Sequence, residues 1–179
     1  MSWDNIWDRM MQICTGQDRQ EFTTFLDLLS AGPSDINILE IGVDFGATLS
    51  AWRAITSGLV IGVDNESYGH RSVEIPNASL VIGNSEDPNI IARVQELLGD
   101  KKVDMLFIDA DHRYEGVKRD FENYSPLVKE GGIVAFHDVV RKVDNCGVWQ
   151  LFDELPQKKF TIYNPDSGDD RGIGVWYKK

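Results

Sequence analysis

The sequence predicts an α/β fold in which a doubly wound, mostly parallel sheet ends in an antiparallel hairpin. Short runs that are apolar on both faces alternate with amphipathic stretches, as strands do when helices cover both faces of a parallel sheet. Near the C-terminus, two strand-like runs flank the turn-forming "DSGDDR", which is typical of a hairpin. With 179 residues, 42% of them hydrophobic, the chain is long enough for a single domain with its own core.

Two amphipathic helices are expected ahead of the sheet. Ser2 is placed to cap the first, because apolar residues at helical spacing follow it. The second spans about 18–29 and ends before Gly32 and Pro33, residue types that terminate helices. The apolar positions of the first helix are Trp3, Ile6, Trp7, Met10 and Cys14.

From residue 36 onward, strands and helices alternate along the chain. The strand-like runs occupy residues 36–42, 58–64, 78–84, 103–109 and 131–138. Helical patterns lie between them at residues 47–55, 89–99 and 115–128. A last helix, "VWQLFDEL" (148–155), precedes the hairpin strands "KFTIYNP" (159–165) and "GIGVWYK" (172–178).

Charge and composition narrow the range of partners. Lys and Arg number 18 against 29 Asp and Glu, a net charge of −11 that disfavours nucleic acid and suits a cation or a cationic small molecule. No apolar run approaches the roughly 18 residues needed to span a membrane, and the N-terminus lacks a signal-peptide pattern. Cys14 and Cys146 have no CxxC spacing, so neither a disulfide framework nor a zinc site is indicated. A cytoplasmic protein is expected.

The turn after the first strand has the pattern E-x-G-x-x-x-G, formed by Glu40, Gly42 and Gly46. Ligands of such sheets bind outside the carboxyl ends of the strands, near the point where strand order reverses. Asp64 follows Gly46 by 18 residues (64 − 46), where an acid that binds a ribose belongs. Asp44 would repel a pyrophosphate, so a nucleoside without phosphates fits better. Turn geometry alone, and an N-cap role for Asp64, are the alternatives.

Polar residues also follow the third strand, in the stretch "GNSED" (83–87). Ser85 and its neighbours have side chains that can form hydrogen bonds with an adenine edge. The same residue types cap helices, and a helix follows directly. The sequence leaves both interpretations open.

Carboxylates end the fourth and fifth strands, at Asp109 and at the pair His137-Asp138. On neighbouring parallel strands they would face each other across one cleft, where like charges repel unless a cation lies between them. Mg²⁺ prefers oxygen ligands, whereas an imidazole suits Mn²⁺ or Fe²⁺ better. The alternative is that both acids cap helices.

His112 lies three residues after Asp109, in the loop over the same cleft. An imidazole with a pKa near 6.5 is suited to act as a general base at neutral pH. The intervening acid, Asp111, either orients His112 or faces water.

Together these motifs resemble the class I S-adenosylmethionine-dependent methyltransferases, over about residues 36–177. The motifs that carry the resemblance are E-x-G-x-x-x-G-x-T, the acid after the second strand, "GNSED", "FIDADHRYEGV", "GGIVAFHDV" and the closing hairpin. Among these enzymes the chain is most similar to the small metal-dependent O-methyltransferases of the catechol, macrocin-type and cephalosporin-hydroxylase-like group. The resemblance implies a Rossmann-like methyltransferase fold, with a catalytic core over 36–177 and a helical N-terminal extension over 1–33.

The resemblance also implies roles for single residues. Those expected to line the methionine moiety of S-adenosylmethionine are Glu40, Gly42, Gly46 and Thr48. Those expected at the ribose and the adenine are Asp64 and Ser85. Those at the metal-ligand positions, for Mg²⁺ or Mn²⁺, are Asp109, His137 and Asp138. His112 stands at the position of the general base, and His137 departs from the family, which usually has an acid there.

The implied reaction is methyl transfer to a hydroxyl of a small molecule or sugar. Little of the chain remains to cover a substrate. We expect the site to be closed by Trp3 and Trp7, by residues 65–77, or by a second subunit of a homo-oligomer. If none of these closes it, the acceptor is large and exposed. Two other functions stay open: a nucleotide-sugar glycosyltransferase whose D-x-D holds Mg²⁺ against a diphosphate, and a non-catalytic interaction module built on the methyltransferase fold.

Overall fold

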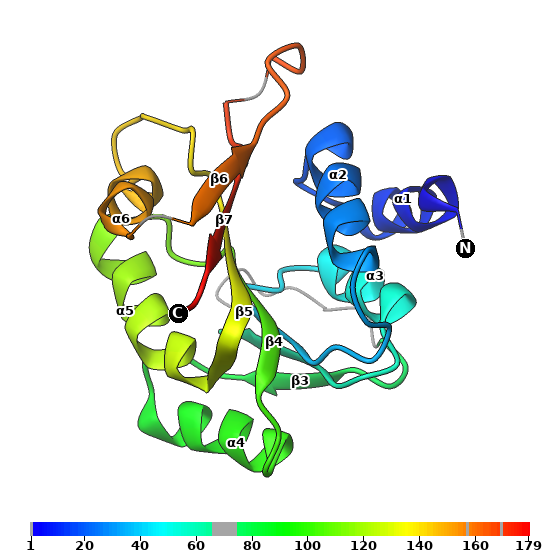
Figure 1. The fold of residues 1–179 in the computed structure, drawn as a ribbon, viewed down its shortest axis with the longest axis vertical. Coiled ribbons are helices and arrows are strands. Elements are labelled where there is room, and N and C mark those ends of the chain that lie inside the picture. The colour runs from blue at the N-terminus through cyan, green and yellow to red at the C-terminus, as the bar shows by residue number, and fades with distance from the viewer. Residues whose placement is uncertain (1, 66–74, 157, 169) are drawn as a thin grey trace.

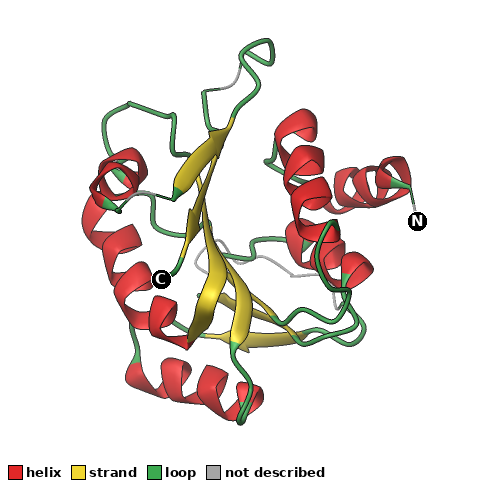
Figure 2. Ribbon diagram, viewed as in Figure 1, coloured by secondary structure: helices red, strands yellow, loops and turns green. Residues whose placement is uncertain are grey.

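A computed structural model describes residues 2–65, 75–156, 158–168 and 170–179. Across these residues, seven strands form one sheet that lies between two groups of helices (Figures 1 and 2). The predicted α/β sheet with a closing hairpin is confirmed. The strands are β1 Ile38–Ile41, β2 Val60–Asp64, β3 Ser79–Ile82, β4 Val103–Ile108, β5 Val128–His137, β6 Lys159–Ile162 and β7 Ile173–Tyr177.

The strand order is β3-β2-β1-β4-β5-β7-β6. Strands β1 to β5 pair in parallel, whereas β7 pairs antiparallel with both β5 and β6. The chain moves outward from β1 through β2 to β3, and then returns to place β4 on the other side of β1. Strand order therefore reverses between β1 and β4, and in such sheets ligands bind at the carboxyl ends of the strands flanking that point.

The helices cover the two faces in order along the chain, α1 to α3 on one face and α4 to α6 on the other (Figure 1). They are α1 Trp3–Ile13, α2 Arg19–Ser30, α3 Ala47–Ile55, α4 Pro88–Leu98, α5 Tyr114–Tyr124 and α6 Val148–Glu154. The core under α1 to α3 is built around Trp52, whose ring centroid lies 5.0 Å from that of Phe22 and 5.4 Å from that of Phe107. No helix in the described ranges is long and apolar enough to cross a membrane.

Local signals explain most of the helix boundaries. Ser2 accepts a hydrogen bond from the backbone of Asn5, and Asp18 accepts one from Glu21, so each caps the helix predicted after it. The helix predicted over 115–128 ends earlier, at Tyr124. A 3₁₀ turn, η1 Ser125–Leu127, follows because Pro126 has no N–H to continue the helical ladder. β5 accordingly starts at residue 128, three residues before the predicted start.

Helix α2 is tied to the closing hairpin by one buried carboxylate. Glu21 accepts hydrogen bonds from the backbone N–H groups of Asn164, at 2.9 Å, and Gly172, at 3.2 Å. These two residues lie on either side of the tip of the β6–β7 hairpin. The contact holds the first helices and the last strands together beside the carboxyl ends of β1, β4 and β5.

Candidate active site

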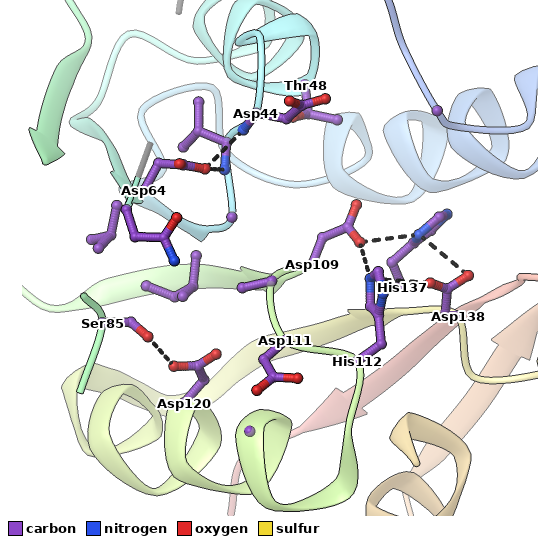
Figure 3. Close-up of a pocket in the computed structure, with 18 of the residues that line it drawn as sticks. Asp44, Thr48, Asp64, Ser85, Asp109, Asp111, His112, Asp120, His137 and Asp138 are labelled. Atoms are coloured by element: carbon purple, nitrogen blue, oxygen red, sulfur yellow. Dashed lines mark hydrogen bonds and ion pairs between the residues drawn. The ribbon is translucent and has the colours of Figure 1, made fainter. Parts of the chain in front are cut away.

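A cavity of about 790 Å³ opens at the carboxyl ends of β1 to β5. Figure 3 shows Asp64 and Ser85 toward one end, Asp109 near the middle, and His137 and Asp138 toward the other end. The cavity therefore runs across the switch point. It brings the predicted cofactor residues and the predicted metal residues into one space, as the strand order requires.

The turn after β1 forms the wall at the switch point. Gly42 has a φ of 89°, and a Cβ on it would lie 2.2 Å from the carbonyl oxygen of Asp109, so only glycine lets the ends of β1 and β4 approach this closely. Gly46, with a φ of 90°, is the N-cap of α3. Gly42 and Thr48 line the cavity.

Glu40 lies beneath this wall and is not a lining residue. Its side chain is 0% exposed and accepts a hydrogen bond from the Thr48 hydroxyl. Burial raises the pKa of Glu40 well above its usual value, although the Thr48 hydrogen bond opposes the rise. Glu40 and Gly46 were both expected at the methionine moiety. Both are buried by the packing of β1 and α3, and they lie behind the residues that line the cavity.

Asp64 binds the same turn from the neighbouring strand. Its Oδ2 accepts hydrogen bonds from the backbone N–H groups of Val43, at 2.8 Å, and Asp44, at 2.9 Å. The carboxylate at the end of β2 thus holds the turn after β1 in place, at the rim of the cavity.

Ser85 lies after β3 and is not the cap of α4. That cap is Asp87, which accepts a hydrogen bond from the backbone of Asn89 at 2.8 Å. The Ser85 hydroxyl instead donates to Asp120 Oδ1 at 2.5 Å (Figure 3). Burial raises the pKa of Asp120 to about 6, and the hydrogen bond from Ser85 opposes the rise. No local pattern points to Asp120, because it lies within a charged helical stretch.

Asp109, His137 and Asp138 form a compact cluster at the other end. They offer ligand atoms that all lie within 4.8 Å of one another. His137 Nδ1 is 3.2 Å from Asp109 Oδ1, and His137 and Asp138 are each 3% exposed. Neither acid caps a helix, since α5 begins after Arg113 and α6 after Gly147. The predicted meeting of the two carboxylates is thus found in the structure.

Two buried atoms of this cluster are chemically unsatisfied. Within the described residues, His137 Nε2 and Asp138 Oδ1 have no hydrogen-bond partner. Buried polar atoms are normally paired, so each such atom calls for an explanation. A carboxylate pair with an imidazole beside it is a donor set that suits a divalent cation. The residues present therefore fit a metal ion.

His112 lies against both carboxylates, as its spacing predicted. Its Nε2 is 3.2 Å from Asp109 Oδ1 and 3.1 Å from Asp138 Oδ2. The hydrogen bond with Asp109 raises the pKa of His112, against the effect of burial. Burial would raise the pKa of Asp109, but the neighbouring His137 and His112 outweigh it and hold that pKa well below its usual range. Asp111 does not orient His112; its carboxylate pairs with Arg113 at 2.6 Å.

Gln17 is a site residue that the sequence did not reveal. It lies in the short loop between α1 and α2, and its Nε2 donates to Asp109 Oδ2 at 2.8 Å. Its Oε1 is buried and has no hydrogen-bond partner among the described residues. Arg171, from the closing hairpin, donates to the carbonyl oxygen of Gly16 in the same loop. Gln17 and Asp109 are 92 positions apart in the chain, so no local pattern could have indicated their contact.

The loop of residues 14–17 lines the cavity where tryptophans were expected to close it. Trp3 and Trp7 pack against the core under α1 to α3 and do not line the cavity. Of the alternatives for these two residues, the structure shows packing of the first helix in the core, since α1 lies against α3, and does not show closure of the site. Most of the other expected cover, residues 65–77, lies outside the described residues.

The sheet, its cavity at the switch point and the acid at the end of β2 define the class of doubly wound α/β proteins, whose ligands bind at this place. Residues 39–139, more than half of the chain, match the family described as a methyltransferase domain. The chain belongs to this family, and its resemblance to the class I S-adenosylmethionine-dependent methyltransferases is confirmed.

Two relatives and one solved structure give the range of similarity. Ribosomal RNA large subunit methyltransferase E of Methanospirillum hungatei is 32% identical over 88 residues, 49% of this chain and 39% of that protein. Demethylmacrocin O-methyltransferase of Streptomyces fradiae is 26% identical over 113 residues, 59% of this chain and 28% of that protein. The match covers well under half the length of both relatives. MycE methyltransferase from the mycinamycin biosynthetic pathway, solved with Mg and S-adenosylhomocysteine (SAH), superposes with a TM-score of 0.67 at 14% identity, over 100% of this chain and 55% of that one.

Proposed function

We propose that this protein transfers a methyl group from S-adenosylmethionine to a hydroxyl of a small molecule or sugar, with the help of a divalent cation. One observation carries the proposal. The cluster of Asp109, His137 and Asp138, with His112 against it, lies in the same cavity as the predicted ribose and adenine residues. A hydroxyl and a methyl donor can thus be held side by side, and this proximity is the main catalytic effect such an enzyme needs.

The cofactor end of the cavity supports a nucleoside. Asp64 at the end of β2 is the expected partner of the ribose hydroxyls, and Ser85 after β3 is the expected partner of the adenine. Gly42 and Thr48 line the same cavity, and the methionine moiety would extend along them toward the metal cluster. The demethylmacrocin relative is named an O-methyltransferase, which agrees with a hydroxyl acceptor.

Asp109, His137 and Asp138 would hold the cation. A bound cation would act as a Lewis acid that lowers the pKa of an acceptor hydroxyl. Because His137 supplies nitrogen where the family usually has a carboxylate, Mn²⁺ or Fe²⁺ suits the site better than Mg²⁺. The MycE structure contains Mg, so Mg²⁺ is tested beside Mn²⁺.

The residues of the chain itself account for the rest of the reaction. His112, in its neutral form, takes the hydroxyl proton of the acceptor at Nδ1, because Nε2 faces the two carboxylates and carries the ring hydrogen that they accept. The acceptor oxygen then attacks the methyl carbon: the new C–O bond forms as the S–C bond breaks, and the sulfonium becomes the neutral thioether of SAH. Asp109 and Asp138 orient the His112 ring, from 3.2 and 3.1 Å. The protein thus contributes chiefly position and charge.

The other functions are less well supported. Membership of the methyltransferase family argues against a glycosyltransferase. One relative is named for ribosomal RNA, but a net charge of −11 is poorly suited to phosphate backbones. A non-catalytic module has no use for a histidine held against two carboxylates, as His112 is.

Calorimetry with SAH and with UDP-glucose, each with and without Mn²⁺ or Mg²⁺, tests the proposal. We expect SAH to bind, UDP-glucose not to bind, and Mn²⁺ to bind the protein alone. Turnover on a panel of catechols and sugars, followed as SAH formation, should stop with EDTA and return with Mn²⁺. Binding of UDP-glucose alone would overturn the proposal, and full turnover in EDTA would remove the cation from it.

The role of His112 has its own test. His112→Ala should lower kcat by roughly 10²–10⁴, the span for a positioned base, and leave SAH affinity unchanged because His112 faces the acceptor. Glu115→Ala, on the exposed face of α5, is the matched control. A His112→Ala protein with wild-type kcat would assign this histidine a structural role.

A further inference from the structure

At the end of the cavity away from the metal cluster, a buried carboxylate faces the interior, and no residue in the described ranges forms an ion pair with it. Asp120, on α5, is 3% exposed and lines the cavity. Its Oδ1 accepts the hydroxyl hydrogen of Ser85 at 2.5 Å, and its Oδ2 has no hydrogen-bond partner among the described residues. The adjacent Arg119 forms its ion pair with Glu86, at 3.0 Å.

The hydrogen bonds around this pair leave only acceptors facing the cavity. An ionised carboxylate has no hydrogen to donate, and a serine hydroxyl has one. That one hydrogen of Ser85 is already donated to Asp120. The Tyr124 hydroxyl donates to the Ser85 carbonyl oxygen at 2.8 Å and so does not supply a donor to the carboxylate. A ligand group placed here must therefore donate hydrogen bonds.

The position of the pair identifies which part of the ligand it meets. Ser85 follows β3, which pairs with β2, and the backbone of Gly83 donates to the carbonyl oxygen of Asp64 at 2.8 Å. If Asp64 binds the ribose, the base extends from it toward the end of β3. The adenine of S-adenosylmethionine carries an exocyclic amine, which is a donor of two hydrogens.

We infer that Asp120 is the residue that selects adenine, by accepting a hydrogen bond from its exocyclic amine while Ser85 is held as a second acceptor. This inference rests on the proposed function. A carboxylate oxygen that loses water without gaining a donor is costly, and the amine supplies a donor to Oδ2 when the cofactor binds. Asp120 therefore discriminates between ligands with and without this amine. If Asp120 were purely structural, it would only hold the loop after β3 through its hydrogen bond with Ser85.

The test compares SAH with its analogue that has purine in place of adenine, which lacks only the amine. Calorimetry of the full-length protein should show SAH binding roughly 10–100-fold more tightly than the purine analogue, the worth of a hydrogen bond to a charged group. In Asp120→Leu this preference should fall to within about threefold, because the loss is confined to the ligand that carries the amine. Asp120→Asn, whose single oxygen accepts the hydrogen bond from Ser85 and whose NH₂ group would then face the amine, should lose the preference as well.

The controls separate the possible outcomes. Glu122→Leu, on the exposed side of the same helix, should keep the wild-type preference. If wild-type protein binds neither ligand, the proposed function fails. If it binds SAH but does not discriminate, or if the Asp120 variants weaken both ligands equally, the inference about Asp120 is wrong and the residue is structural. Thermal unfolding of each variant confirms that it is folded before it is compared.

Discussion

Replacing Asp120 by Asn should stabilise this protein at neutral and alkaline pH and have little effect near pH 4. Asn has almost the same shape as Asp and can still accept the hydrogen bond from Ser85, but it carries no charge. The carboxylate it replaces is 3% exposed and has no cation paired with it among the described residues. The substitution therefore removes the cost of a buried charge and little else.

The size of the effect follows from the pKa. Burial raises the pKa of Asp120 from 3.8 to about 6. The unfolded carboxyl loses its proton at a lower pH than the folded one, so between about pH 4 and 6 the folded state holds more protons and the free energy of unfolding falls as the pH rises. The difference of 6 − 3.8, at about 1.36 kcal/mol for each pH unit, amounts to a loss of about 3 kcal/mol above pH 6.

Thermal unfolding at pH 4 and at pH 8 measures this difference. For a chain of 179 residues, 3 kcal/mol corresponds to a rise in Tm of roughly 6–12 °C at pH 8. Asp8→Asn, which removes an exposed carboxylate from α1, gives the matched change in net charge and should shift Tm little at either pH. Equal Tm changes for Asp120→Asn at pH 4 and pH 8 would refute the reasoning, because they would show that burial does not hold the proton on Asp120.

Two further predictions concern the cofactor and the metal cluster. Asp64→Ala should weaken SAH binding by roughly 1–3 kcal/mol, through loss of the ribose contact and of the two hydrogen bonds that hold the turn after β1; unchanged affinity in calorimetry would place the ribose contact elsewhere. Gln17→Leu should weaken Mn²⁺ binding roughly tenfold, because Asp109 loses a hydrogen bond that fixes its orientation. Electron paramagnetic resonance of free Mn²⁺ measures that affinity, with Gln20→Leu on the exposed face of α2 as control. Equal Mn²⁺ affinity in Gln17→Leu and wild type would leave the loop of residues 14–17 without a part in the metal cluster.

Local patterns in the sequence predict most of the helices and strands of the fold. The caps Ser2 and Asp18, the glycines around β1 and the apolar strand runs act over a few residues, so their effect can be predicted without knowing what packs nearby. Pro126 is a local signal too: the 3₁₀ turn that contains it ends α5 at Tyr124, before the predicted end at residue 128. The gathering of Asp109, His137 and Asp138 also followed from the pattern, since the carboxyl ends of parallel strands share one edge of the sheet.

The α/β sheet, the strand ends at which polar side chains gather, and the class of methyltransferase that the chain resembles can thus be predicted from sequence patterns. Which side chains reach the cavity depends on how the elements pack. Glu40 is covered by packing, Gln17 reaches Asp109 across 92 residues, and Asp120 meets Ser85 across 35. Side-chain contacts between elements far apart in the chain depend on how the helices pack on the sheet. The spacing of residues along the chain does not encode this packing.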